Sequence, residues 1–314
     1  MTWGSENAGT VCVTRSQARI RPGCMDVFLA ALGHPSQTPG VLLDECLSIS
    51  FFGDLGPVDM SLRSLAAQVA RRVLGRYVAS RKRFRAQIEG KFGLEIGGPS
   101  NAFGDSGELP LYRFLAGLDN CVFSVETIWE GRRAEGLTYS YHPNKAKGFN
   151  FVREATDLQG IADHTYDFVL SSHNLEHISN PLRALKEWTR VVKPGGAIIV
   201  LLPDYRRTFD HRRKPTPIEH MLEDYELARD ERDLTHLEEI LELHDLSRDP
   251  GGVSNEYFRQ RSLRNFENRC LHHHVFDERN SRELFEAIGL TVQVLELVKP
   301  LHIVILALCP PIDA

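Results

Sequence analysis

The stretch Phe92-Gly93-Leu94-Glu95-Ile96-Gly97-Gly98-Pro99-Ser100 organises the rest of the sequence around it. An apolar run with one acidic residue ends here in a tight glycine turn. Because glycine has no Cβ, a strand that stops at such a turn lets its backbone approach a ligand closely. The carboxylate of Glu95 suits an ammonium group or a ribose hydroxyl better than a phosphate. Gly-Gly-Pro also occurs in ordinary loops, so the segments that follow decide between a loop and a binding site.

Length and composition set the broad class. The chain has 314 residues, 42% of them hydrophobic and 25% charged, which is typical of a soluble globular protein with one large domain and an insertion, or with two domains. The net charge of -5 argues against a general nucleic-acid binder. No apolar run reaches the ~18 residues of a membrane span, and the N-terminus lacks a signal-peptide pattern. The 6 cysteines form no CxxC pair, so we expect reduced thiols in a cytoplasmic protein.

From Phe92 onward, apolar strands alternate with helical stretches. The strands are expected at about 92–96, 121–125, 149–153, 166–171 and 196–202. Between the last two, residues 181–192 form an amphipathic helix that begins with a proline. This alternation predicts a parallel sheet with helices on both faces.

The end of the chain has a different pattern. Residues 281–288 predict a helix, and two strands follow at about 291–298 and 302–309. Only Lys299-Pro300 and its neighbours separate these strands. So short a link permits only an antiparallel hairpin, because parallel strands need a long crossover.

Three further segments complete the organisation. Residues 1–60 have an irregular composition and are expected to form an N-terminal extension, with the main domain at 61–314. Residues 61–90 predict a basic helix, which is either solvated or in contact with an anionic partner. Residues 204–275 predict a largely helical insertion after the fifth strand, including an acidic helix at 233–245.

These patterns together resemble the class I S-adenosylmethionine-dependent methyltransferases that act on small molecules. The resemblance rests on Glu95-Ile96-Gly97-Gly98, on Tyr166 to His173, and on the run from Leu175-Glu176-His177 to Lys193-Pro194-Gly195-Gly196. It implies a Rossmann-like, doubly wound α/β sheet of order 3-2-1-4-5-7-6 with an antiparallel last strand. It also implies S-adenosyl-L-methionine as the cofactor. Pro99 and Asn101 depart from the glycines that are common in the first motif.

The resemblance assigns cofactor contacts to the strand ends. Glu95, Gly97, Gly98 and Pro99 would hold the methionine end and the near side of the ribose. Glu126 follows the second strand, where an acidic residue accepts hydrogen bonds from the ribose hydroxyls.

The adenine and the end of the fourth strand complete the expected cofactor site. Asp157 and Leu158 would contact the adenine, with Asp163 as a competing acid. Ser172 and His173 end the fourth strand, at the crevice where ligands bind in open α/β sheets.

His173 and His211 are the candidate general bases, because the pKa of histidine is close to physiological pH. His177, in the widespread Leu-Glu-His pattern, is expected to be structural. The insertion holds 7 of the 13 histidines and is expected to form a lid that contacts substrate. Their spacing matches no metal motif, so no metal is predicted.

The sequence therefore predicts a methyltransferase that acts on a polar small molecule. We expect an O-methylation of a sugar or glycoconjugate, because the insertion is polar and rich in His and Arg. Two alternatives remain at this point: a non-methylating enzyme on the same fold, and a non-catalytic module that binds S-adenosylmethionine.

Overall fold

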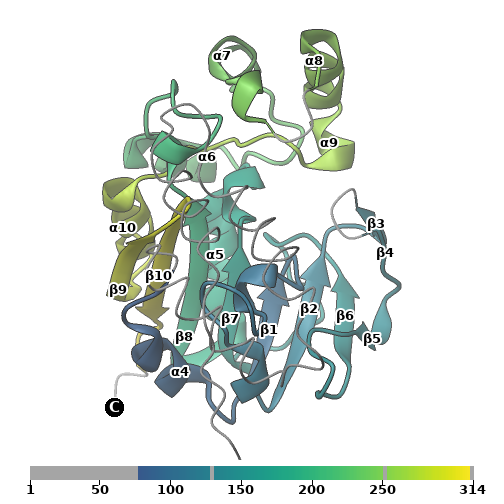
Figure 1. Cartoon of the computed structure of the whole chain (residues 1–314), viewed down its shortest axis with the longest axis vertical. Coiled ribbons are helices and arrows are strands. Elements are labelled where there is room, and N and C mark those ends of the chain that lie inside the picture. The colour runs from purple at the N-terminus through teal and green to yellow at the C-terminus, as the bar shows by residue number, and fades with distance from the viewer. Residues whose placement is uncertain (1–76, 128–130, 250–252, 312–314) are drawn as a thin grey trace, which may run out of the picture. The chain divides into compact units, whose positions relative to one another are not determined.

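The computed structural model describes residues 77–127, 131–249 and 253–311. The strands are Phe92–Ile96 (β1), Gly117–Val122 (β2), Glu126–Thr127 (β3), Gly131–Arg132 (β4), Gly136–Tyr139 (β5), Gly148–Val152 (β6), Tyr166–Ser172 (β7), Val192–Pro203 (β8), Thr291–Val298 (β9) and His302–Leu308 (β10). Eight of them form one sheet of order β5-β6-β2-β1-β7-β8-β10-β9, and β3 and β4 form a small separate hairpin (Figure 1).

The sheet confirms the predicted topology. Strands β6, β2, β1, β7 and β8 run parallel to one another, whereas β10 is antiparallel to both β8 and β9. This is the order 3-2-1-4-5-7-6 with the expected antiparallel strand. The edge strand β5, which pairs antiparallel with β6, was not predicted.

Strand β2 differs from the prediction in its bounds, since it begins at Gly117 rather than at residue 121. Asp119 and Asn120 have the composition of a loop. Asn120 is nevertheless fully buried, and its side chain accepts from the Gly98 backbone N–H at 2.9 Å and donates to Asn150 at 2.8 Å. Partners distant in sequence thus satisfy a polar side chain inside the sheet.

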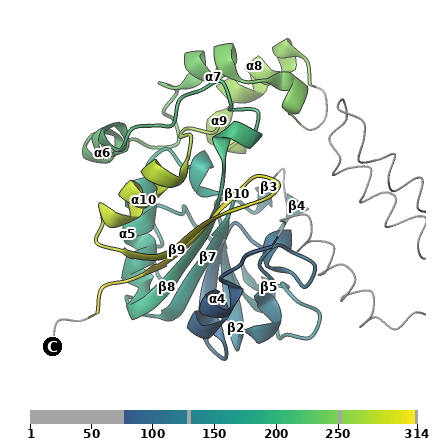
Figure 2. The same ribbon diagram turned by 60° about the vertical axis from the view of Figure 1, so that its left-hand side comes forward.

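Helices α5 (Pro181–Val191) and α10 (Glu278–Glu286) cover one face of the sheet (Figure 2). Asn180 caps α5 by accepting from the Arg183 N–H, and the apolar stripe that includes Trp188 is buried. Helix α10 begins at residue 278 rather than at 281, because Asp277 forms a capping box with Asn280.

Helix α4 (Arg81–Ile88) and an irregular segment at 101–115 cover the other face. In the described residues between β1 and β6 there is no α-helix, so on this face the expected helices are replaced by short 3-10 turns. The 3-10 turns of the domain are Asn101–Phe103 (η1), Tyr112–Phe114 (η2), Leu175–His177 (η3), Tyr205–Arg207 (η4) and Leu246–Arg248 (η5). The expected N-terminal extension, and residues 61–76 of the expected basic helix, lie outside the described residues.

The segment between β8 and α10 contains Ile218–Glu226 (α6), Leu237–Leu243 (α7), Asn255–Leu263 (α8) and Asn265–Asn268 (α9). Figures 1 and 2 both show these helices as a tier at the carboxyl end of the parallel strands. Helix α7 is shorter than the predicted 233–245, since Asp233 accepts from the backbone and hydroxyl of Thr235 in a turn that precedes it. Among the described helices, none combines the length and the apolar character needed to cross a membrane.

Candidate functional site

A cavity of about 490 Å³ lies at the carboxyl ends of the parallel strands. Its floor comes from the ends of β1, β2, β6, β7 and β8 and from the loops that follow them. Its roof comes from the segment between β8 and α10. The roof residues are Arg207, Thr208, Phe209, Glu231, Arg248, Arg269 and His272. The ends of the strands and the insertion therefore enclose the same cavity. It lies at the place where open α/β sheets bind ligands.

The glycine turn after β1 forms part of the floor through Gly97, Pro99 and Ser100. Gly97 has a φ of +73°, and a Cβ there would lie 2.6 Å from the amide nitrogen of Asn174. Gly98 is buried behind the turn, where a Cβ would lie 2.3 Å from the Glu95 carboxyl carbon. Both positions require glycine, and only Gly97 reaches the cavity.

Glu95 does not line the cavity. It is fully buried, and it accepts hydrogen bonds from the hydroxyls of Tyr112 (2.9 Å) and Tyr139 and from the Ser100 N–H at 3.1 Å. Burial raises the pKa of this carboxyl to about 7, against the opposing effect of these donors. Its position supports a role in fastening the turn rather than the predicted contact with the methionine end.

His173, which directly follows β7, lines the cavity together with Ser172. Its φ of 50° places it in the left-handed region, which non-glycine residues rarely adopt. Its Nδ1 lies 3.3 Å from Oε1 of Glu176, and its Nε2 lies 2.8 Å from Nδ1 of His302. Strained backbone of this kind is concentrated at functional sites.

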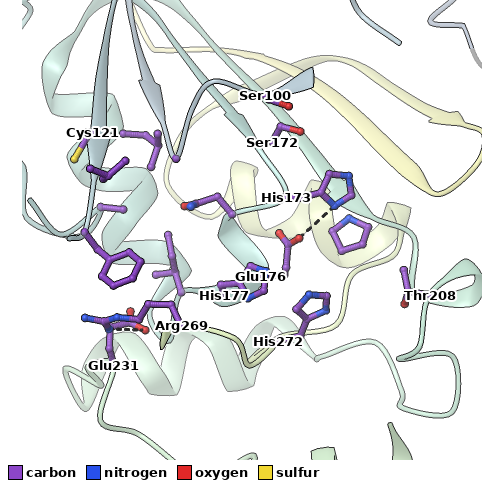
Figure 3. Close-up of a pocket in the computed structure, with 18 of the residues that line it drawn as sticks. Ser100, Cys121, Ser172, His173, Glu176, His177, Thr208, Glu231, Arg269 and His272 are labelled. Atoms are coloured by element: carbon purple, nitrogen blue, oxygen red, sulfur yellow. Dashed lines mark ion pairs between the residues drawn. The ribbon is translucent and has the colours of Figure 1, made fainter. Parts of the chain in front are cut away.

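Two buried acceptors beside His173 were missed by the sequence analysis. Glu176 is 1% exposed, and its Oε2 has no hydrogen-bond partner among the described residues, while its Oε1 lies near His173. The side-chain oxygen of Asn174 likewise has no hydrogen-bond partner among the described residues. Burial favours a higher pKa for Glu176, but the imidazoles of His173, His177 and His272 outweigh it and lower the pKa (Figure 3). The cavity thus contains a buried anion and an amide oxygen that can accept from a cationic ligand.

On the roof, His272 is paired with a buried carboxylate. Its Nδ1 lies 2.6 Å from Oδ2 of Asp210, whose other oxygen accepts from Arg213 at 3.1 Å. Burial lowers the pKa of His272, but Asp210 more than offsets this and the pKa is raised. A carboxylate on Nδ1 fixes the tautomer, so that Nε2 of the neutral ring carries the lone pair.

His177 lies against His272, with 4.6 Å between ring centroids. Its Nδ1 is 3.1 Å from the Leu271 carbonyl, which can only accept. Burial and the neighbouring His272 lower the pKa of His177 to about 4, so this ring is neutral. His177 also lines the cavity, and the structural role expected for it stays a prediction.

Arg269, a residue of the roof, contacts side chains of both the roof and the floor. It contacts Glu154 at 2.6 Å and Glu231 at 3.2 Å, and its guanidinium lies 5.1 Å from the ring centroid of Phe123 (Figure 3). Burial raises the pKa of Glu231 to about 7. The insertion is therefore joined to the ends of β2 and β6 by a largely buried ion-pair cluster.

Besides Glu95 and Gly98, three predicted cofactor residues are not brought to the cavity: Glu126, Asp157 and Leu158. Glu126 is exposed at the start of β3, while Phe123, nearer the end of β2, lines the cavity instead. Asp157 is exposed, and Leu158 is fully buried in the core beneath α5. The competing Asp163 is exposed and pairs with Arg190 at 2.7 Å.

His211 is also absent from the cavity lining. Its Nε2 lies 2.8 Å from Oδ2 of Asp245, and the neighbouring Arg212 contacts the same carboxylate. The catalytic candidate that the roof presents is His272, which the sequence analysis counted only among the histidines of the insertion. No local signal distinguished it, because its partner Asp210 lies 62 positions away.

Comparisons with known proteins agree with this geometry. Residues 133–200 match the family described as "Methyltransferase domain". The chain is 36% identical over 63 residues to a ubiquinone/menaquinone biosynthesis C-methyltransferase of Bdellovibrio bacteriovorus, covering 19% of this chain and 27% of the relative. It is 30% identical over 100 residues to a demethylmenaquinone methyltransferase of Lysinibacillus sphaericus, covering 27% and 42%. These matches span less than half the length of either relative.

Solved structures of methyltransferases are also similar. One is a S-adenosylmethionine-dependent methyltransferase from Aquifex aeolicus (14% identity, TM-score 0.38, covering 78% of this chain and 98% of that one). Another is from Methanosarcina mazei (17% identity, TM-score 0.41, covering 73% and 97%). Residues 133–200 thus match the methyltransferase domain family, and the strand order of the described sheet is the one expected for class I S-adenosylmethionine-dependent methyltransferases. S-adenosyl-L-methionine is the cofactor of this class.

Proposed function

We propose that the protein transfers the methyl group of S-adenosylmethionine to a hydroxyl of a polar small molecule, such as a sugar or glycoconjugate. The observation that carries this proposal is the Asp210–His272 pair on the roof of the cavity, opposite the glycine turn. A histidine held by a carboxylate is suited to take a proton from a hydroxyl.

The residues of the floor are suited to bind S-adenosylmethionine. The methionine ammonium needs acceptors, and within the described residues Oε2 of Glu176 and the side-chain oxygen of Asn174 are buried without a hydrogen-bond partner. Gly97 allows close approach at the same end of the cavity. Ile96, Val122 and Ala155 provide apolar surface for the adenosine part. When bound, the cofactor supplies an electrophilic methyl group on a sulfonium.

The residues of this chain then act on the acceptor. His272 would take the hydroxyl proton on Nε2, which makes the acceptor oxygen nucleophilic towards the methyl group that the bound cofactor would supply. Asp210 stabilises the resulting imidazolium, because it is ionised: its buried carboxyl has a pKa of about 2, held low by His272 and Arg213 against the effect of burial. The Arg269 cluster keeps the insertion over the site and limits the access of water.

Polar groups on the roof favour a polar acceptor. Thr208, Arg207 and Arg248 line the cavity together with His272. The net charge of -5 further favours a small molecule over a nucleic acid.

A second candidate is the C-methylation of a quinone, which the names of the curated relatives favour. A quinone ring presents less hydrogen-bonding surface to these side chains, so we rank it below the hydroxylated acceptor.

Two measurements on the full chain test the proposal. Calorimetry with S-adenosylmethionine and S-adenosylhomocysteine is expected to show one site with micromolar affinity, ~ -8 kcal/mol. Absence of binding would reject the cofactor and with it the enzyme. Transfer of labelled methyl to a panel of sugars, glycoconjugates and a demethylated quinone is then expected to label a hydroxyl. Labelling of quinone carbon alone would replace the first acceptor class by the second, and binding without any transfer would favour a non-catalytic module.

A further inference from the structure

A second cluster of histidines lies outside the cavity lining. His220 and Asp224 project from one face of α6, His236 immediately precedes α7, and His274 comes from the segment before α10. One nitrogen or oxygen atom of each lies within 4.8 Å of those of the other three. None of the four side chains lines the cavity described above.

Three of the six distances between possible ligand atoms in this cluster are close to the edges of a coordination tetrahedron. Nε2 of His220 lies 3.2 Å from Nε2 of His236 and 3.4 Å from Oδ2 of Asp224. Nε2 of His274 lies 2.9 Å from the same Oδ2. A tetrahedral zinc ion with ligands at ~2.0–2.1 Å separates its ligand atoms by ~3.3–3.4 Å. The four side chains therefore need only small shifts to share one ion.

Two charged side chains also lie beside the cluster. Side chains around the cluster can orient the ligands: Glu223 lies 3.9 Å from Nδ1 of His220, and Arg229 lies 3.9 Å from the second oxygen of Asp224.

We propose that His220, Asp224, His236 and His274 bind one zinc ion that fastens α6 and the turn before α7 to the segment before α10. Four protein ligands close the coordination sphere, which is characteristic of a structural rather than a catalytic zinc site. The sequence spacing predicted no metal, because these residues match no metal motif until the chain is folded.

The experiment measures zinc in the full chain. Protein stripped with a chelator is reloaded with Zn²⁺, passed over a desalting column and analysed for bound metal. We expect about one zinc per chain in the wild type and a rise of several degrees in its melting temperature on reloading. His220→Ala and Asp224→Asn are expected to reduce the zinc content at least ~10-fold, because three-ligand remnants bind weakly. Both should lose the melting-temperature rise.

His164→Asn is the matched control. His164 is exposed, lies outside the insertion and has a φ of 56°, which asparagine tolerates. This variant should keep the bound zinc. Equal zinc retention by all variants would mean adventitious binding and overturn the proposal, as would a wild type that retains no zinc.

Reloading the wild type with Co²⁺ tests the geometry without any substitution. The intense visible bands of tetrahedral cobalt support the site, and a weak octahedral spectrum contradicts it. Because these readouts do not require methyl transfer, the zinc proposal and the proposed function can fail separately.

Discussion

The floor and the roof of the cavity are built in different ways. On the floor, Gly97, Ser172 and His173 lie at or directly beyond the ends of strands, and each is positioned by its own strand. On the roof, His272 depends on Asp210, which lies 62 positions earlier, and Arg269 depends on Glu154, which lies 115 positions earlier. The geometry of the floor thus follows from local structure, and that of the roof follows from long-range packing.

The two sides also differ in how their charges are satisfied. The roof charges are paired, as in Asp210–His272 and Arg269–Glu231. On the floor, Oε1 of Glu176 lies 3.3 Å from Nδ1 of His173, and Oε2 has no hydrogen-bond partner among the described residues. Floor substitutions should therefore change cofactor affinity, whereas roof substitutions should change turnover.

His272→Asn should produce the largest effect and test the role of the roof. We expect turnover to fall about 10²–10³-fold, because the general base is removed. Cofactor affinity by calorimetry should stay within about threefold. His211→Ala is the comparison, since His211 has a similar carboxylate partner but does not line the cavity. A loss in His211→Ala as large as that in His272→Asn would contradict our assignment of the base.

Glu95→Gln tests whether the buried carboxyl of Glu95, which lies behind the glycine turn, stabilises the floor of the cavity. The pKa of Glu95 is raised from 4.5 to about 7, so the folded state binds its proton more tightly than the unfolded state. The contribution of protonated Glu95 to the stability of the folded state is therefore fully present below pH 4.5 and is lost as the pH rises through about 7. The free energy of unfolding of the wild type, relative to the variant, should fall by about 3 kcal/mol over this range. Chemical denaturation at several pH values measures it, and a constant difference would contradict the raised pKa.

Glu176→Gln should weaken cofactor binding about 30-fold, since a hydrogen bond from an ammonium to a carboxylate contributes ~1.5–3 kcal/mol. Glu126→Gln makes the same chemical change on an exposed side chain away from the cavity, and should leave the dissociation constant within about twofold. Calorimetry compares the two variants. The reverse ranking would restore Glu126 as the ribose ligand and remove Glu176 from the site.

Gly97→Ala should have the smallest effect, a weakening of cofactor binding of about 5–10-fold, because the new Cβ is strained at φ +73° and meets Asn174. Gly160→Ala is the control, since it carries similar strain at φ +87° with nothing within 4 Å of the new Cβ. Equal affinities in the two variants would show that the contact with Asn174 is unimportant.

Much of the fold was predictable because its signals are local. The bounds of β1 and β9 are those expected from the apolar runs, and the short link at Lys299-Pro300 correctly required an antiparallel hairpin. The start of β2 was wrong, because Asn120 is kept in the sheet by Gly98 and Asn150, which are remote in sequence.

The amino-acid sequence alone determined the order of the sheet, the glycine turn and the class of protein, since hydrophobic periodicity and turn residues act over a few positions. The tertiary structure decided that Glu95 lies behind the turn, that Glu176 and His272 face the cavity, and that four scattered side chains converge beside α6. Such contacts depend on which segments the packed core brings together, and that information is not contained in the spacing of residues along the chain.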